Sequence, residues 1–231
     1  MSPKSFIYVA ILSAIPLAAA EDIVVPMNLV HENGIGNVVA QTDAPRVERP
    51  VWPPPGSTWT VQNKSTGSIG SVGSVTATWQ AVGEQDWDGR RVIGLTPGGG
   101  FYLYFDANRR IVAQVRDGKP VQTYDPYEAL YDWPLFVGKS WVSEFRIRDY
   151  IREQTVALKY DFRVEAVEEV TTPAGVFKTF RIRRDGPDDR YIVWFNPELA
   201  VEVKRVWERF SSHRLGPGTN EMELLSHDVK K

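Results

Sequence analysis

An alternation of apolar and charged residues from Val156 to Ala166 constrains the fold of this chain more than any other feature. Apolar side chains stand at every even position, and from residue 159 on the odd positions are charged: Lys159, Asp161, Arg163 and Glu165. A period of two residues is that of a β-strand, whose successive side chains point to opposite faces of a sheet. The pattern predicts a long strand with one buried face, as antiparallel sheets have.

The chain contains two similar halves, which we interpret as a tandem duplication. Gly56-Ser57-Thr58-Trp59 returns in kind as Gly138-Lys139-Ser140-Trp141, and the segments 79–84 and 101–106 correspond to 164–169 and 191–196. The distance between corresponding segments grows along the chain, as turn insertions between matched strands would cause. Five strands are expected in the first half, near 57–62, 74–84, 90–96, 100–105 and 110–117. The predicted fold is all-β: a strongly curved antiparallel sheet or half-barrel built from two tandem repeats, 56–124 and 129–231.

A short helix is expected to connect the two repeats. Asp125 is a good capping residue, Pro126 suits the first helical position, and Glu128 completes a capping box. Trp133-Pro134 ends this helix within about two turns, because a proline restricts the residue before it to extended conformations.

The residues before the repeats divide into two segments. Residues 21–44 resemble a β-hairpin around Asn33-Gly34, a pair that tolerates positive φ in a two-residue turn. Five prolines then make 45–55 a stiff linker, because each proline fixes φ.

The first twenty residues have the features of a secretory signal peptide. A basic start at Lys4 precedes the apolar run from Phe6 to Ala19, which is shorter than the roughly 20 residues that span a bilayer. We expect cleavage near Ala20 and a mature protein that is periplasmic or secreted, with no transmembrane segment.

Composition excludes several kinds of chemistry. The chain has no cysteine, so disulfides, thiolate metal sites and the lipid anchor of a bacterial lipoprotein are impossible. A formal net charge of −2 does not attract nucleic acid or an anionic membrane. The three histidines include no closely spaced pair, so no metal and no cofactor is expected.

The residues do not form a recognisable catalytic set. The chain has no Gly-x-Ser-x-Gly elbow, and His213 follows Ser211-Ser212 in a polar loop where solvation is the simpler expectation. Turn chemistry accounts for the carboxylates of Asp185, Asp188 and Asp189. No catalytic residue is assigned.

Two groups of aromatic residues are candidates for ligand binding. Trp59, Tyr104, Trp141 and Trp194 occupy equivalent places in the two halves and either line an apolar cavity or fill a packed core. Tyr124, Tyr127, Tyr131 and Trp133 form either a sugar-stacking platform at the junction of the repeats or simple anchors for the connector.

Three motifs in the second half carry a resemblance to a known group of proteins. They are Gly-Lys-Ser-Trp at 138–141, Thr-Thr-Pro-Ala-Gly-Val-Phe at 171–177 and Trp-Phe-Asn-Pro-Glu at 194–198. Together they resemble uncharacterised bacterial envelope proteins, similar to the lipoprotein-carrier fold of the LolA/LolB type. The resemblance implies a strongly bent sheet over a hydrophobic cavity and brings no catalytic residues with it.

These observations favour an exported, non-enzymatic binding protein of the cell envelope that carries or senses an apolar ligand in a β-sheet cavity. Its expected partner is an apolar small molecule or lipid. One alternative is a scaffold or interaction protein that binds another envelope protein, and a second is a hydrolase.

Export itself is testable. The small residues Ala18 and Ala20 suit the signal peptidase, so N-terminal sequencing of the exported protein should begin at Glu21. A retained N-terminus would contradict the signal-peptide interpretation and imply an anchored protein.

Overall fold

A computed structural model describes residues 37–38, 44–67, 73–213 and 216–230. All regular elements in these residues are β-strands: β1 (Asn37–Val38), β2 (Thr58–Ser65), β3 (Gly73–Trp87), β4 (Arg90–Gly98), β5 (Phe101–Phe105), β6 (Ile111–Arg116), β7 (Lys119–Glu128), β8 (Ser140–Asp149), β9 (Gln154–Thr172), β10 (Gly175–Asp185), β11 (Asp189–Asn196), β12 (Val201–Arg209) and β13 (Gly218–Asp228).

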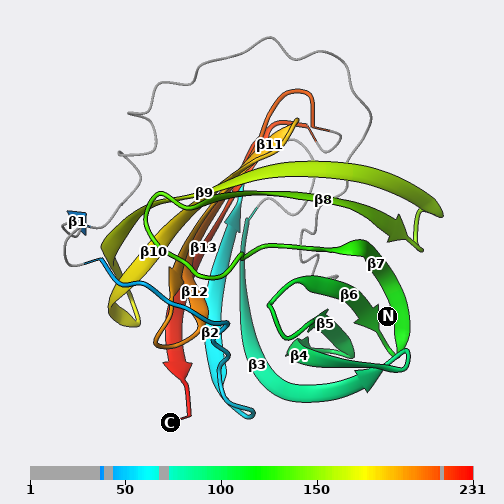
Figure 1. Cartoon of the computed structure of the whole chain (residues 1–231), viewed down its shortest axis with the longest axis horizontal. Coiled ribbons are helices and arrows are strands. Elements are labelled where there is room, and N and C mark those ends of the chain that lie inside the picture. The colour runs from blue at the N-terminus through cyan, green and yellow to red at the C-terminus, as the bar shows by residue number, and fades with distance from the viewer. Residues whose placement is uncertain (1–36, 39–43, 68–72, 214–215, 231) are drawn as a thin grey trace.

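Twelve of these strands form one closed antiparallel sheet (Figure 1). Each strand from β2 to β13 pairs with the next strand along the chain, and β13 pairs back with β2 from Asn220↔Ser65 to Asp228↔Thr58. The short β1 adds to β9 at Asn37↔Glu169. Among the described residues, the sheet is therefore a barrel of neighbouring strands.

The predicted half-barrel of two repeats is wrong. Both edges that a half-barrel leaves open are paired here, since β13 bonds to β2 and β8 bonds to both β7 and β9. An unpaired strand edge exposes a row of backbone donors and acceptors, and closing the ring satisfies them.

The predicted connecting helix is also wrong. Residues 119–128 form β7, in which Tyr124 pairs with Ile147 and Asp125 with Arg146. A helix cap contributes only about 0.5–2 kcal/mol. Pairing with β8 places Tyr124 in the core, where it is 3% exposed, and burial of one large apolar side chain alone is worth about 1.5–3 kcal/mol.

The strand predictions hold well for the rest of the chain. The five strands expected between residues 57 and 117 correspond to β2 through β6. In β9, Leu158, Tyr160 and Phe162 are buried, whereas Lys159 and Asp161 are exposed, which confirms the alternation that predicted this strand.

The segments predicted to precede the two repeats lie mostly outside the described residues. The signal peptide and all but Asn37, Val38 and Ala44 of the predicted hairpin fall there. In the 45–55 segment, Val47 forms an isolated antiparallel bridge with Leu135, which ties this segment to the connection between β7 and β8.

Strand β3 curves sharply, and Gly83 is the reason (Figure 1). The pairing with β4 shifts register between Ala81 and Gly83, where φ of Gly83 is +87°. A Cβ at this position would lie 2.7 Å from Cγ of Pro55. The glycine thus permits both the bulge and the close approach of the linker.

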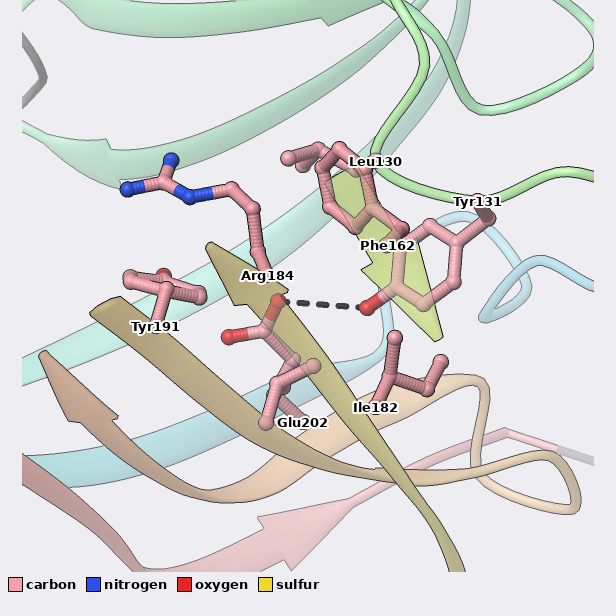
Figure 2. Close-up of a pocket in the computed structure, with 8 residues that line it drawn as sticks. Leu130, Tyr131, Phe162, Ile182, Arg184, Tyr191 and Glu202 are labelled. Carbon is pink, nitrogen blue, oxygen red and sulfur yellow. Dashed lines mark hydrogen bonds between the residues drawn. The ribbon is translucent and has the colours of Figure 1, made fainter. Parts of the chain in front are cut away.

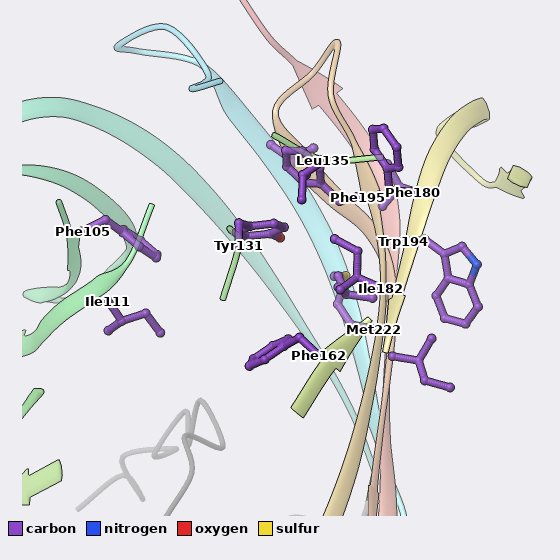
Figure 3. Packing of buried hydrophobic residues seen from close by; sticks show 14 of the residues in the cluster. Phe105, Ile111, Tyr131, Leu135, Phe162, Phe180, Ile182, Trp194, Phe195 and Met222 are labelled. Atoms are coloured by element: carbon purple, nitrogen blue, oxygen red, sulfur yellow. The ribbon is translucent and has the colours of Figure 1, made fainter. Parts of the chain in front are cut away.

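The main hydrophobic core joins strands from both halves of the chain (Figure 3). Tyr131 lies between Phe105 and Ile111 on one side and Phe195 on the other, with 4.8 Å between the ring centroids of Tyr131 and Phe195. Leu135, which is fully buried, belongs to the same connection between β7 and β8. This connection therefore fills the interior and is more than a link between strands.

One cooperative folding unit is expected from this architecture. Fragments 44–128 and 129–231 should each lack a sharp thermal transition and a near-ultraviolet circular dichroism signal, because each would keep two unpaired edges and lose the core partners held by the other. The intact chain should melt in one transition. Sharp melting of both separate fragments would contradict the single-core description, and co-expression of the two halves is the control for fragment quality.

Candidate functional site: a buried charge cluster inside the barrel

Three charged side chains lie almost fully buried inside the barrel. Glu128 ends β7, Arg184 lies on β10, and Asp189 begins β11; they are 0%, 1% and 1% exposed. Ionised groups are rarely buried, because removing a charge from water costs several kcal/mol unless it is paired. We call Glu128, Arg184 and Asp189 the charge cluster.

Arg184 and Asp189 form the tight pair of the cluster. Arg184 Nη2 donates to Asp189 Oδ2 at 2.6 Å, and the same oxygen accepts the indole N–H of Trp207 at 2.7 Å. The guanidinium also lies 4.0 Å from the ring centroid of Tyr160 and 4.9 Å from that of Tyr191. The cation is thus held by one carboxylate and two aromatic faces.

Glu128 is left outside this pair. Its Oε1 lies 3.9 Å from Arg184 Nη1, which is too long for a hydrogen bond, and neither of its oxygens has a hydrogen-bond partner among the described residues. Burial raises the pKa of Glu128 to about 7; the charge of Arg184 opposes this shift and that of Asp189 adds to it. Because Arg184 lies closer to Asp189 than to Glu128, its charge offsets only part of the effect of burial on the pKa of Glu128.

A second polar group lines the interior next to the cluster (Figure 2). The hydroxyl of Tyr131 donates to Glu202 Oε1 at 3.1 Å. Arg205 donates to the other oxygen of Glu202 at 3.5 Å and to Asn63 Oδ1 at 3.2 Å. Burial raises the pKa of Tyr131 well above its ordinary value, so its hydroxyl stays a donor.

A small hollow separates the two polar groups (Figure 2). The surface that faces it is almost entirely apolar, although two charged residues belong to its lining: Leu130, Tyr131, Phe162, Ile182, Arg184, Tyr191, Val193 and Glu202. The cavity volume of the hollow is about 10 Å³. That is about what one water requires, whereas pockets for organic ligands measure roughly 300–1,000 Å³.

Arg109 is another buried cation and fastens the linker to the barrel. Its guanidinium donates to the carbonyl oxygens of Val51 at 2.5 Å and Ala200 at 3.1 Å, and it lies 4.5 Å from the ring centroid of Trp52. Burial lowers the pKa of Arg109, with the nearby Tyr131 acting in the opposite direction. These two hydrogen bonds join the backbone of the linker to the backbone of the barrel.

The four aromatics predicted to line a cavity lie in different surroundings. Trp59 is in the main core, Trp194 donates to Glu168 Oε2 at 2.7 Å, and Trp141 stacks on Phe162 at 5.0 Å. Tyr104 belongs to a separate apolar cluster, 5.8 Å from the ring of Tyr102. None of the four lines the hollow. Their binding of a ligand stays a prediction.

The predicted junction platform is also dispersed. Tyr124 is buried and accepts a hydrogen bond from Gln114, whereas Tyr127 is half-buried and accepts one from the exposed Arg90. Trp133 stacks at 6.2 Å on Tyr131. Of this group Tyr131 alone lines the hollow, and sugar binding likewise stays a prediction.

Sequence reasoning missed the charge cluster, although one signal was present. Phe180, Ile182 and Arg184 alternate along the residues that form β10, so a charged residue shares a face with apolar ones. The sequence pattern favours a helix cap for Glu128 and a turn for Asp189.

His213 lies in an environment that differs from the expected one. It is 4% exposed, and its ring lies 5.5 Å from that of Trp207, so the prediction of a solvated side chain is wrong. Asp188, Asp189 and His213 bring carboxylate and imidazole ligand atoms within 4.8 Å of one another, a donor set that suits zinc. Asp189 is already paired with Arg184, which weakens its attraction for a cation.

No family model and no curated protein matches the chain. Among the described residues, no helix is long and apolar enough to cross a membrane.

Several solved structures show a distant likeness. A "putative lipoprotein" from Parabacteroides distasonis is 14% identical over 79% of this chain and 99% of its own, with a TM-score of 0.38. A "putative exported protein with YmcC-like fold" from Bacteroides fragilis is 10% identical over 78% and 99%, with a TM-score of 0.43. The "hypothetical lipoprotein YmcC" from Escherichia coli is 11% identical over 76% and 89%, with a TM-score of 0.38. Likeness at this level supports no inference about function, and the relation to lipoprotein carriers stays a prediction.

The pKa of Glu128 has a consequence for stability. Between pH 4.5 and about 7 the folded protein keeps this proton while the unfolded chain releases it. The resulting stabilisation is fully present below pH 4.5 and is lost as the pH rises through about 7, a change of about 3 kcal/mol in the free energy of unfolding.

Urea denaturation across this pH range measures the effect. Glu128→Gln should remove most of the decrease in the free energy of unfolding as the pH rises, because glutamine carries no titrating proton. Glu144→Gln is the matched control, since the Glu144 side chain is 64% exposed. An unchanged pH dependence in Glu128→Gln would show that Glu128 titrates normally.

Proposed function

We propose that this chain is an exported, non-enzymatic protein of the cell envelope that binds another envelope component through its outer surface. Export is supported by the signal-peptide features of residues 1–20. The observation that carries the choice of surface is the small size of the hollow inside the barrel.

A carrier of an apolar ligand would need a larger hollow. A volume of about 10 Å³ holds about one water, whereas organic ligands occupy pockets of roughly 300–1,000 Å³. Enlarging the hollow would also require opening a sheet in which every strand from β2 to β13 is hydrogen-bonded on both sides. Both effects disfavour the interior as a ligand site.

The hydrolase alternative has one feature in its favour. A carboxyl with a pKa near 7, such as that of Glu128, is typical of catalytic acids and bases. The burial that raises this pKa also separates Glu128 from any substrate, since its side chain is fully enclosed. The charge cluster is better explained as part of the packed interior.

Native mass spectrometry of the exported protein, purified from its own envelope fraction without detergent, tests this proposal. The expected mass is that of the chain without residues 1–20 and without a bound small molecule. The control is the same protein after unfolding, extraction and refolding. An additional mass that this treatment removes would overturn the proposal and support a carrier.

A further inference from the structure

The hairpin between β8 and β9 presents apolar side chains to solvent. Tyr150 is 45% and Ile151 74% exposed, and Ile151 is the most exposed large hydrophobic residue among those described. Figure 1 shows β8 and β9 as a long ribbon whose turn lies at the periphery of the molecule. Turn positions normally carry polar residues, so an isoleucine there requires an explanation.

The turn is well anchored by Asp149, which is buried. Asp149 Oδ1 accepts the backbone N–H groups of Ile151 at 3.0 Å and Arg152 at 2.9 Å, while Oδ2 accepts from Gln122 at 3.1 Å. The backbone N–H of Tyr150 donates to the carbonyl of Val121 at 3.0 Å. These bonds fix the turn against β7, so Tyr150 and Ile151 are held outward before any partner arrives.

The surroundings of the two apolar side chains are basic. Arg146 and Arg148 are exposed on this hairpin, and Arg148 lies 5.8 Å from the ring centroid of Tyr150. Arg152 is also exposed, but it is paired with the buried Asp149 at 2.7 Å. The adjacent β6–β7 turn adds the exposed Arg116 and Lys119. Exposed acids in the same region are Asp117, Asp125 and Glu153. With Arg152 neutralised by Asp149, four basic groups stand against these three acids.

We propose that this hairpin tip docks on a bilayer surface that carries anionic phosphate headgroups. The inference rests on the proposed function, because it names the component that the outer surface binds. Ile151 enters the interface between headgroups and acyl chains, and Tyr150 lies at headgroup level, where its ring and hydroxyl are both accommodated. The arginines reach the phosphates while their stems cover apolar surface.

The net charge of −2 predicts no attraction of the chain as a whole to an anionic membrane, but this contact involves only the hairpin tip. Charges more than about 10 Å away are screened at physiological salt, so the local basic group governs the interaction. A protein groove would accept the apolar pair equally well, but phosphate headgroups also satisfy the surrounding arginines. The charge distribution therefore favours the membrane surface.

Vesicle flotation with the full exported chain tests the proposal. The protein should float with vesicles of phosphatidylcholine and phosphatidylglycerol, and much less with phosphatidylcholine alone. Ile151→Asp should weaken binding about ten- to hundredfold, which corresponds to burial of one isoleucine side chain. Arg148→Gln should weaken it severalfold and reduce its salt dependence.

Val176→Asp is the matched control, since Val176 is 64% exposed at the start of β10 and should leave binding unchanged. Thermal melting checks that each variant is folded. The proposal is overturned if the protein does not float, if Ile151→Asp and Val176→Asp weaken binding equally, or if lipid charge makes no difference. Absence of flotation together with a bare mass in native spectrometry would leave the outer surface as the binding site and point to a protein partner.

Discussion

Closure of the sheet by the pairing of β13 with β2 is the interaction on which the rest of the structure depends. It connects the last described strand of the chain to the first strand of the barrel, over the register from Asn220↔Ser65 to Asp228↔Thr58. Once the ring is closed, each strand from β2 to β13 has a neighbour on both sides along at least part of its length, and the inner face becomes an enclosed volume. Every inward side chain must then be accommodated by its neighbours.

The connection between β7 and β8 is a consequence of this enclosure. Twelve strands enclose more space than short aliphatic side chains fill, and this connection contributes Tyr131 and Leu135 to that space. The remaining room is occupied by long charged side chains such as Arg184 and Arg205, whose aliphatic stems and planar groups pack against aromatic rings. For the buried pair of Arg184 and Asp189, the cost of desolvation offsets much of the electrostatic attraction.

Glu128 illustrates how an enclosed interior alters acid–base chemistry. In the unfolded chain it is an ordinary carboxyl, and in the barrel it competes with Asp189 for one guanidinium. Asp189 is closer and also receives the indole N–H of Trp207, so Glu128 is left to desolvation. Its shifted pKa therefore reflects the geometry of its neighbours, and a catalytic role is not needed to explain it.

Local sequence patterns predict most of the strands. The two-residue period in β9 and the all-β class follow from such patterns, because alternation of side chains acts over a few residues. Closure of the sheet, the place of Asp125-Pro126 in a strand and the meeting of Glu128, Arg184 and Asp189 are visible only in the folded structure. These outcomes depend on contacts between residues far apart in the chain, and a pairing of β13 with β2 leaves no mark in the local pattern of either strand.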